Sequence, residues 1–351
     1  MDPCGNLHLP ANAGTIRAHA SPCRNRLDNL SDGARPHRLS TPPDYHPNAT
    51  SRSQISMPRA DRLMTIYLAH PLARFLAAQQ GTRVPILMYH SISENLFGMS
   101  HPYFQINTLP EVFSQQMRWL RNAGYRSIDL KQAWTGLEGG TDLSKTIVIT
   151  FDDGYRDFYT DALPILKQCG FTATIFLATN RIHNRPARIE GADYLTWNEV
   201  RELHSQGICF GAHTVTHPDL RSLGPDQLDY ELGRSKETIE DHLGVAVESF
   251  SYPHGFPEED KNHARYLEDL LSNLGYDHGV STILGRASRK SNRFFLPRLP
   301  VNSLDDLPFF EAKLHGGYDW LHWPQLLKKY IFHQTAILQE KPKSKVGTSS
   351  C

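Results

Sequence analysis

The amino-acid sequence predicts an α/β protein in which parallel strands are joined by helical crossovers. From residue 83 onward, short apolar runs alternate with segments of helical periodicity. The run 147–151 is apolar apart from Thr150, which is typical of a strand buried on both faces of a parallel sheet. Six or seven strand–helix pairs follow one another. The polar motifs come at the carboxyl ends of strands, where α/β folds place their sites.

The first half of this region begins with the run 84–89, an expected strand. The dipeptide Leu109-Pro110 opens an amphipathic segment and predicts a helix that runs to about Asn122. The other expected elements of this half are a short extended piece from Gly124, helices over 130–137 and 155–169, and strands over 147–151 and 172–177.

The second half repeats the pattern after an irregular insertion, residues 181–193, which we expect to face the substrate. Thr196 with Glu199 three positions later is the signature of a capping box, so a helix is expected to begin there and end at Ser205. Further helices are expected over 226–243 and 258–274, and strands over 208–210, 249–252, 279–282 and 296–301.

A single catalytic domain, residues 83–302, is expected to hold these elements. Residues 1–60 are rich in proline, contain no lysine and show no apolar period, so we expect a disordered segment. The aromatic-rich stretch 303–339 predicts a C-terminal helical extension, and the polar residues 340–351 predict a disordered tail.

Composition and charge narrow the classes of function. Basic and acidic residues both number 37, so the formal net charge is zero and no overall field favours nucleic acid. No stretch approaches the roughly 20 apolar residues of a transmembrane segment. The N-terminus shows no signal-peptide pattern, which leaves the cytoplasm as the default location. The five cysteines have neither disulfide-framework nor zinc-knot spacing.

Two adjacent carboxylates, Asp152 and Asp153, end the apolar run 147–151. Because the chain turns at a strand end, both side chains could face one cavity. One carboxylate would then coordinate a metal ion, while the other takes a proton from water. The alternative is a helix N-cap, in which an aspartate before Gly154 satisfies free backbone N–H groups.

Two histidines four residues apart, His213 and His217, end a later apolar run. This spacing places both imidazoles on one side of a helical turn, although the pattern alone is common by chance. No glutamate follows the first histidine, so the zinc-protease motif is absent. Two neutral imidazoles and one carboxylate leave open coordination positions on Zn²⁺ or a similar ion, with Co²⁺ and Ni²⁺ as the other candidates. The combination indicates a metal-assisted hydrolase.

Three motifs in this order resemble those of the polysaccharide deacetylases of the NodB-homology type, carbohydrate esterase family 4. They are residues 150–155 (Thr-Phe-Asp-Asp-Gly-Tyr), 213–217 (His-Thr-Val-Thr-His) and 251–255 (Ser-Tyr-Pro-His-Gly). The opening run 84–92 (Val-Pro-Ile-Leu-Met-Tyr-His-Ser-Ile) is also similar to this family, in particular to the branch that acts on poly-N-acetylglucosamine. The resemblance covers roughly residues 83–302.

This resemblance implies a distorted (β/α)₇ barrel that hydrolyses the acetamide of an amino sugar, so the expected partner is an N-acetylated glycan. By motif position, the expected metal ligands are Asp153, His213 and His217, and the expected general base is Asp152. A tetrahedral oxyanion would form against the metal ion and a backbone N–H, expected to be that of His254 following Pro253.

The chain departs from the family pattern at two points. Family members carry an arginine two residues before the proline of the third motif, which tethers the base, whereas this chain has Ser251. Arg298 is the expected substitute. They also carry a late Leu-x-x-His whose imidazole is the catalytic acid, and no match follows residue 300. His90 is the expected acid, with His254 and His278 as alternatives; for both His90 and Arg298 a purely structural role is the other possibility.

Tyr155 and Tyr252 are candidates for a surface on which a sugar ring stacks, with a core or rim position as the alternative. The leading hypothesis is a metal-dependent hydrolase that removes N-acetyl groups from an N-acetylglucosamine-type polysaccharide or oligosaccharide. Two alternatives stay open. One is a catalytically weak or inactive carbohydrate-binding homologue, motivated by the two departures, and the other is a deacylase of a glycolipid or an O-acetyl ester.

Overall fold

The structure, a computed structural model, describes residues 60–76, 81–94 and 106–340. The expected disordered segments, 1–60 and 340–351, lie outside these residues except for one boundary residue each. Within the described part of the chain, no helix is both long enough and apolar enough to cross a membrane.

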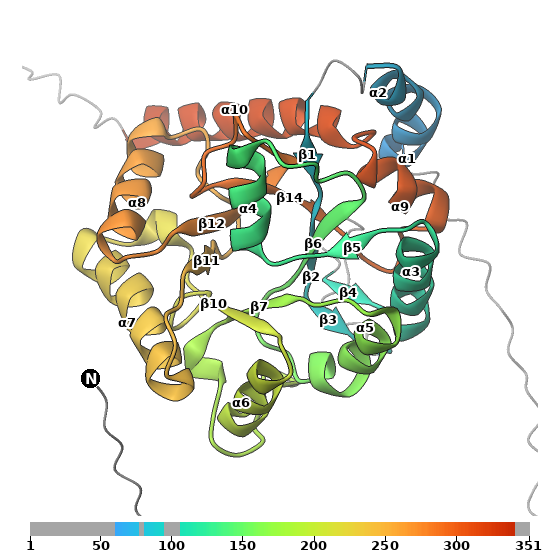
Figure 1. Cartoon of the computed structure of the whole chain (residues 1–351). Coiled ribbons are helices and arrows are strands. Elements are labelled where there is room, and N and C mark those ends of the chain that lie inside the picture. The colour runs from blue at the N-terminus through green and yellow to red at the C-terminus, as the bar shows by residue number, and fades with distance from the viewer. Residues whose placement is uncertain (1–59, 77–80, 95–105, 341–351) are drawn as a thin grey trace, which may run out of the picture. The chain divides into compact units, whose positions relative to one another are not determined.

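Parallel strands close into a seven-stranded barrel (Figure 1). In the order of their pairing, the strands are β2 (Ile86–Tyr89), β6 (Thr146–Phe151), β7 (Thr174–Leu177), β10 (Cys209–Ala212), β11 (Ser249–Ser251), β12 (His278–Leu284) and β14 (Leu296–Pro300). The ring closes where β14 returns to β2, with Leu299 opposite Leu87. One further strand, β5 (Arg126–Ser127), pairs with β6 beside the ring. The predicted (β/α)₇ barrel is confirmed.

The barrel is irregular at two places in the ring. β10 and β11 share a single register pair, Ala212 with Phe250. The register between β12 and β14 shifts between Val280 and Leu284. The predicted distortion therefore lies in the part of the ring that runs from β10 to β14.

Helices surround the barrel and follow the strands in sequence. They are α3 (Pro110–Asn122), α4 (Leu130–Gly139), α5 (Leu163–Cys169), α6 (Trp197–Ser205), α7 (Pro225–Leu243) and α8 (Lys261–Asn273). The capping box of Thr196 and Glu199 at the start of α6 is present as predicted. The helix expected from residue 155 instead begins with a π-helical turn, η4 (Phe158–Ala162), because Tyr155 forms a β-bridge with Tyr194.

Apolar side chains fill the amino end of the barrel. They form one buried cluster that joins five barrel strands to α4: Ile86, Val148, Phe176, Val280, Leu296, Trp134 and Leu137. Figure 1 shows α4 lying across the barrel. β6 is buried at all six positions, since the barrel interior covers one of its faces and helices cover the other. The polar site therefore occupies the opposite, carboxyl end.

The insertion 181–193 is more regular than expected. It follows a short 3₁₀ turn, η5 (Thr179–Arg181), and contains a two-stranded hairpin of β8 (Arg188–Ile189) and β9 (Ala192–Asp193). Two backbone hydrogen bonds fasten it beside the first motif: Leu195 N–H to Gly154 O at 3.0 Å and Arg156 N–H to Asp193 O at 2.9 Å. The hairpin thus borders the carboxyl end of β6.

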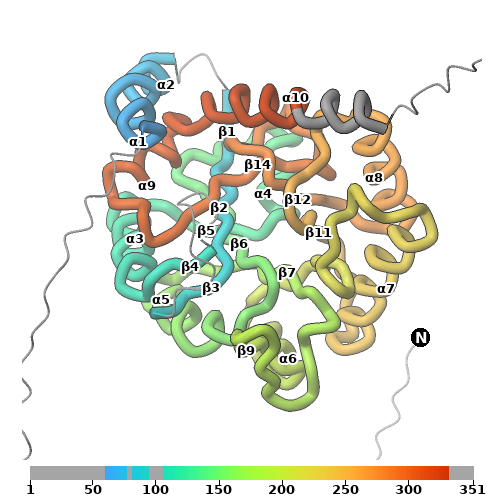
Figure 2. The backbone as a smooth tube through the Cα atoms, turned by 180° about the vertical axis from the view of Figure 1, so that it is seen from behind, coloured from blue at the N-terminus to red at the C-terminus, as the bar shows by residue number. Residues whose placement is uncertain are grey.

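Additional helices precede and follow the barrel. Before it lie α1 (Ala60–Met64), η1 (Thr65–Ala69) and α2 (His70–Leu76), which the sequence patterns did not predict. After it lie α9 (Leu307–Leu314), η7 (Asp319–Leu321) and α10 (His322–Glu340). Trp320 Nε1 donates a hydrogen bond to Thr65 Oγ1 at 3.2 Å, so the two sets pack together, as Figure 2 shows at the upper edge of the view.

Candidate active site

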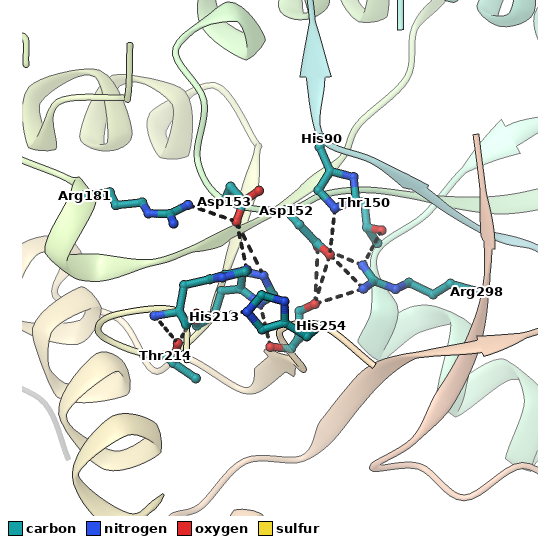
Figure 3. Close-up of polar contacts among 11 residues, drawn as sticks. His90, Thr150, Asp152, Asp153, Arg181, His213, Thr214, His254 and Arg298 are labelled. Atoms are coloured by element: carbon teal, nitrogen blue, oxygen red, sulfur yellow. Dashed lines mark hydrogen bonds and ion pairs between the residues drawn. The ribbon is translucent and has the colours of Figure 1, made fainter. Parts of the chain in front are cut away.

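Asp152 and Asp153 lie next to each other where β6 ends (Figure 3). The backbone N–H of Asp152 still continues the sheet and donates to the carbonyl of Tyr89 at 3.0 Å, whereas Asp153 adopts a left-handed φ of 73°. Gly154 follows with φ 78°, and a Cβ at that position would lie 2.8 Å from the side chain of Leu177. This tight turn brings both buried carboxylates to the carboxyl end of the barrel, as predicted.

Asp153 meets both predicted histidines. Its Oδ1 lies 3.2 Å from Nε2 of His217 and 3.7 Å from Nε2 of His213. One ligand atom from each of the three residues lies within 4.8 Å of the others. Nδ1 of His213 is 2.7 Å from the carbonyl oxygen of Ser251. Because a carbonyl oxygen only accepts, Nδ1 carries the proton and the lone pair of Nε2 points toward Asp153.

Burial keeps both imidazoles neutral at neutral pH. It lowers the pKa of His213 to about 4, and burial together with the charge of Arg181 lowers the pKa of His217 to about 4. Neutral imidazole is the form that binds a metal ion. One carboxylate and two neutral imidazoles this close together fit a divalent ion of the Zn²⁺ type.

Asp152 faces a different partner, Arg298 of β14. Both residues are almost fully buried, and two hydrogen bonds of 2.8 Å join the guanidinium to the two carboxylate oxygens. Ser251, which stands in the place of the family's arginine, accepts from Arg298 at 3.1 Å and donates to Asp152 at 3.3 Å. The structure therefore brings the expected substitute cation to the expected base.

The remaining guanidinium hydrogens of Arg298 also find acceptors. Nε donates to the carbonyl of Ser281 at 3.0 Å, and Nη1 reaches Oγ1 of Thr150 at 3.3 Å. Burial alone would raise the pKa of Asp152, but the charge and hydrogen bonds of Arg298 more than offset it and hold that pKa well below its usual range. Asp152 is therefore ionised at neutral pH.

The loop that carries His217 is strained and firmly held. Thr214 and His217 adopt left-handed φ values of 68° and 61°. Glu231, a buried carboxylate on α7, accepts hydrogen bonds from the backbone N–H groups of Val215 and Thr216 at 2.8 and 2.9 Å and from the Thr216 hydroxyl at 2.7 Å. No sequence pattern pointed to Glu231, because its contacts are formed only when α7 packs against this loop.

The candidate acids differ in position. Nε2 of His90 lies 4.0 Å from Oδ2 of Asp152, and the side chain is partly exposed. The His254 ring lies against that of His217, with centroids 4.6 Å apart. His278 instead begins β12 at the amino end of the barrel and packs against Trp134, so the structure removes it from the candidates.

The two predicted sugar-stacking residues, Tyr155 and Tyr252, differ in exposure. Tyr252 is 1% exposed and packs among core aromatics, so its ring offers no open face and the expectation for this residue was wrong. Tyr155 is partly exposed and stacks on Tyr194 at 5.0 Å beside the first motif. Pro253 is buried, and the following His254 is exposed with φ 55°. The backbone N–H of His254 donates to no acceptor among the described residues.

Arg181 also borders the candidate site. It begins the insertion that was expected to face the substrate, but no sequence pattern singled out this residue. Its Nη1 lies 3.5 Å from Oδ1 of Asp153 (Figure 3). Its guanidinium lies 5.4 Å from the ring centre of Tyr194. The available signal was its position just after β7, at the carboxyl end of a barrel strand.

Similar proteins agree with this geometry. A family model described as polysaccharide deacetylase matches residues 139–278, which include all three motifs. YxkH of Bacillus subtilis (strain 168), which carries the same family name, is 33% identical over 248 residues, covering 70% of this chain and 78% of that protein. A poly-beta-1,6-N-acetyl-D-glucosamine N-deacetylase of Staphylococcus aureus (strain MSSA476) is 22% identical over 201 residues, covering 54% of this chain and 66% of that protein.

A solved structure shows the same fold. The Streptococcus pyogenes deacetylase PplD, solved in complex with acetate, superposes with a TM-score of 0.56 and 26% identity, covering 67% of this chain and 99% of that one. The family predicted from the three motifs is confirmed by these matches. The chain belongs to the polysaccharide deacetylases, a family of hydrolases.

Proposed function

We propose that the protein is a metal-dependent deacetylase that hydrolyses the acetamide of an N-acetylglucosamine-type polysaccharide or oligosaccharide. The observation that carries this proposal is the pairing of two functions at one strand end. Asp153 converges with His213 and His217, while its neighbour Asp152 is kept ionised and oriented by Arg298. A ligand set and a separate base are the two parts that metal-assisted hydrolysis needs.

The ligands proposed for the ion are Asp153, His213 and His217. A divalent ion there, most simply Zn²⁺ with Co²⁺ or Ni²⁺ as alternatives, would polarise the acetyl carbonyl and acidify water. Asp152 would accept the proton of the attacking water, which it can do because it is ionised at neutral pH.

Two further groups would act on the substrate. The backbone N–H of His254 would donate to the carbonyl oxygen as negative charge develops on it. His90 would donate a proton to the leaving amine, since it is partly exposed and lies 4.0 Å from Asp152. Arg298 is fully buried and would act through Asp152 as a positioning residue, not on the substrate itself.

The substrate class has support from one kind of relative. The Staphylococcus aureus relative is named for poly-beta-1,6-N-acetyl-D-glucosamine, and the sequence motifs resemble the same branch. A neutral N-acetylglucosamine oligomer is therefore the first substrate to test. O-acetyl esters and acylated glycolipids are the alternative substrates, and binding without turnover would identify a carbohydrate-binding homologue.

The decisive experiment compares Asp152→Asn with Asp153→Asn. We expect Asp152→Asn to keep its metal content and lose about 10²–10⁴-fold in the rate of amine release, because it removes the base and its ion pair with Arg298 but none of the proposed metal ligands. Asp153→Asn should lose both metal and activity. Asp241→Asn, the same substitution at an exposed position of α7, is the matched control and should keep both the metal content and the activity of wild type. An Asp152→Asn protein as fast as wild type would refute the assignment of the base.

A further inference from the structure

Arg181 places a positive charge at the edge of the proposed metal site. Its side chain is 20% exposed, so solvent and ligands can reach it, and Asp153 is its ion-pair partner at 3.5 Å. Among the described residues, no other carboxylate forms an ion pair with Arg181. The contacted atom, Oδ1, is also the oxygen nearest to both imidazoles.

Asp153, the ion-pair partner of Arg181, is also a proposed ligand of the metal ion. A divalent ion lies about 2 Å from a carboxylate ligand and would repel a guanidinium that points at the same oxygen. With the ion in place, the attraction between Asp153 and Arg181 is largely cancelled. Arg181 is then a cation at the rim of the site without an anionic partner from the described residues.

The surroundings hold this cation in position. The ring of Tyr194 lies 5.4 Å from the guanidinium, a cation–π distance, and Tyr155 stacks on Tyr194 with the ring centres 5.0 Å apart. The backbone of the preceding turn is tied to the histidine loop, with Thr179 N–H to Thr214 O at 3.1 Å. A guanidinium restrained in this way loses little entropy when it binds a planar or tetrahedral anion.

We propose that Arg181 is a specificity residue that binds an anionic substituent of the substrate, carried on or next to the N-acetylated sugar. The proposal rests on the proposed deacetylase function and narrows its substrate class. A carboxylate and a phosphate share the required chemistry, because each presents two oxygens to the guanidinium fork. Tyr155, the partly exposed member of the tyrosine pair beside Arg181, would contact the apolar face of the same sugar.

The test compares three substrates: a neutral N-acetylglucosamine oligomer, an N-acetylmuramic acid-containing oligomer, and N-acetylglucosamine 1-phosphate. We expect wild type to prefer at least one anionic substrate in kcat/KM by about tenfold or more, the size of one charged hydrogen-bonded pair. Arg181→Gln should remove that preference by raising KM for the anionic substrate. Arg181→Lys keeps the positive charge but not the planar guanidinium, so its preference for the anionic substrate should lie between those of wild type and Arg181→Gln.

Controls separate this role from a structural one. Arg188→Gln changes an exposed arginine of the same insertion, whose Nε bonds to the Gly191 carbonyl, and should leave the preference intact. If Arg181→Gln weakens metal binding and lowers turnover of neutral and anionic substrates equally, Arg181 positions Asp153 and the proposal is overturned. A wild-type enzyme without preference for either anion would also overturn it.

A binding experiment keeps the two proposals distinguishable. Calorimetry on metal-loaded Asp152→Asn protein measures binding of the neutral and anionic sugars without turnover. Wild type could deacetylate none of the substrates while Asp152→Asn still binds the anionic sugars more tightly than the neutral one. If Arg181→Gln abolishes that difference in affinity, the anion site is supported and only the deacetylase function is refuted. Equal binding of neutral and anionic sugars would remove the anion site whatever the activity.

Discussion

Arg298 and Asp152 form a bidentate ion pair inside the barrel, with both N···O distances at 2.8 Å and almost no exposure of either side chain (Figure 3). The two residues are 146 positions apart in the sequence. A buried pair of this kind contributes little net stability over an apolar pair, but loss of one partner leaves an uncompensated buried charge. The pair therefore keeps the proposed base ionised and holds its carboxylate in one orientation. Its burial also makes the stability of the fold sensitive to mutation of either residue.

Replacing Arg298 tests this relationship. Arg298→Met should lower the free energy of unfolding by about 3–5 kcal/mol, because Asp152 remains buried without its cation. The double variant with Asp152→Asn should recover much of that loss. Urea unfolding of the three proteins measures both effects, and Arg234→Met, which breaks only an exposed pair on α7, should change stability by less than about 0.5 kcal/mol. Equal stability of Arg298→Met and wild type would contradict the buried-pair account.

Glu231 should control metal affinity without touching the metal. It accepts three hydrogen bonds from residues 215 and 216, next to His217. Glu231→Ala releases this strained loop and should weaken metal binding by about 10–100-fold, as for other groups that hold a ligand in place. Competition with a chelator measures the change, and Glu237→Ala, an exposed position of the same helix, is the control. Unchanged affinity in Glu231→Ala would show that the loop keeps its shape unaided.

Much of the fold, and the convergence of four candidate site residues, were predictable because the ends of parallel strands lie at the same end of the barrel. Apolar periodicity predicted the strands, and the aspartate and histidine motifs each followed one, so the barrel brought them together. Tyr252 was wrong for a simple reason. Ser251 points at Asp152, and the next residue of an extended chain points the opposite way, into the core.

Residues that act through contacts between distant segments were harder to predict. Arg298 was predicted only as a substitute for the arginine missing from the third motif, since no nearby residue in the sequence indicates that it pairs with Asp152. Glu231 and Arg181 were not singled out because helix periodicity and loop composition do not indicate which groups of other segments contact these side chains. These positions depend on how α7 and the insertion pack, which a single sequence does not encode in any local pattern.

His90 is expected to supply the proton to the leaving amine. His90→Gln should lower kcat by about 10²-fold with a smaller change in KM, because proton transfer to the leaving amine is slowed. The exposed His183→Gln serves as the matched control. If His90→Gln keeps the kcat of wild type and His254→Gln loses it, the acid is His254.

The metal-free protein should lose stability as pH falls from about 6.5 to about 4. The pKa of His213 and of His217 is lowered to about 4 by burial, so in this window the unfolded chain binds protons that the folded chain does not. Above about pH 6.5 both states are neutral and the effect vanishes. Each imidazole can contribute a slope of at most about 1.4 kcal/mol per pH unit.

The comparison that isolates this effect is wild type against His217→Gln, unfolded with urea in the presence of a chelator at about pH 7.5 and about pH 5. The variant should lose less stability between the two pH values, because it has one fewer imidazole that resists protonation. Asp157, whose pKa is raised by burial to about 6, acts with the opposite sign but is common to both proteins and cancels in the difference. Parallel pH dependences for the two proteins would mean that His217 takes up its proton in the folded state at the ordinary pH.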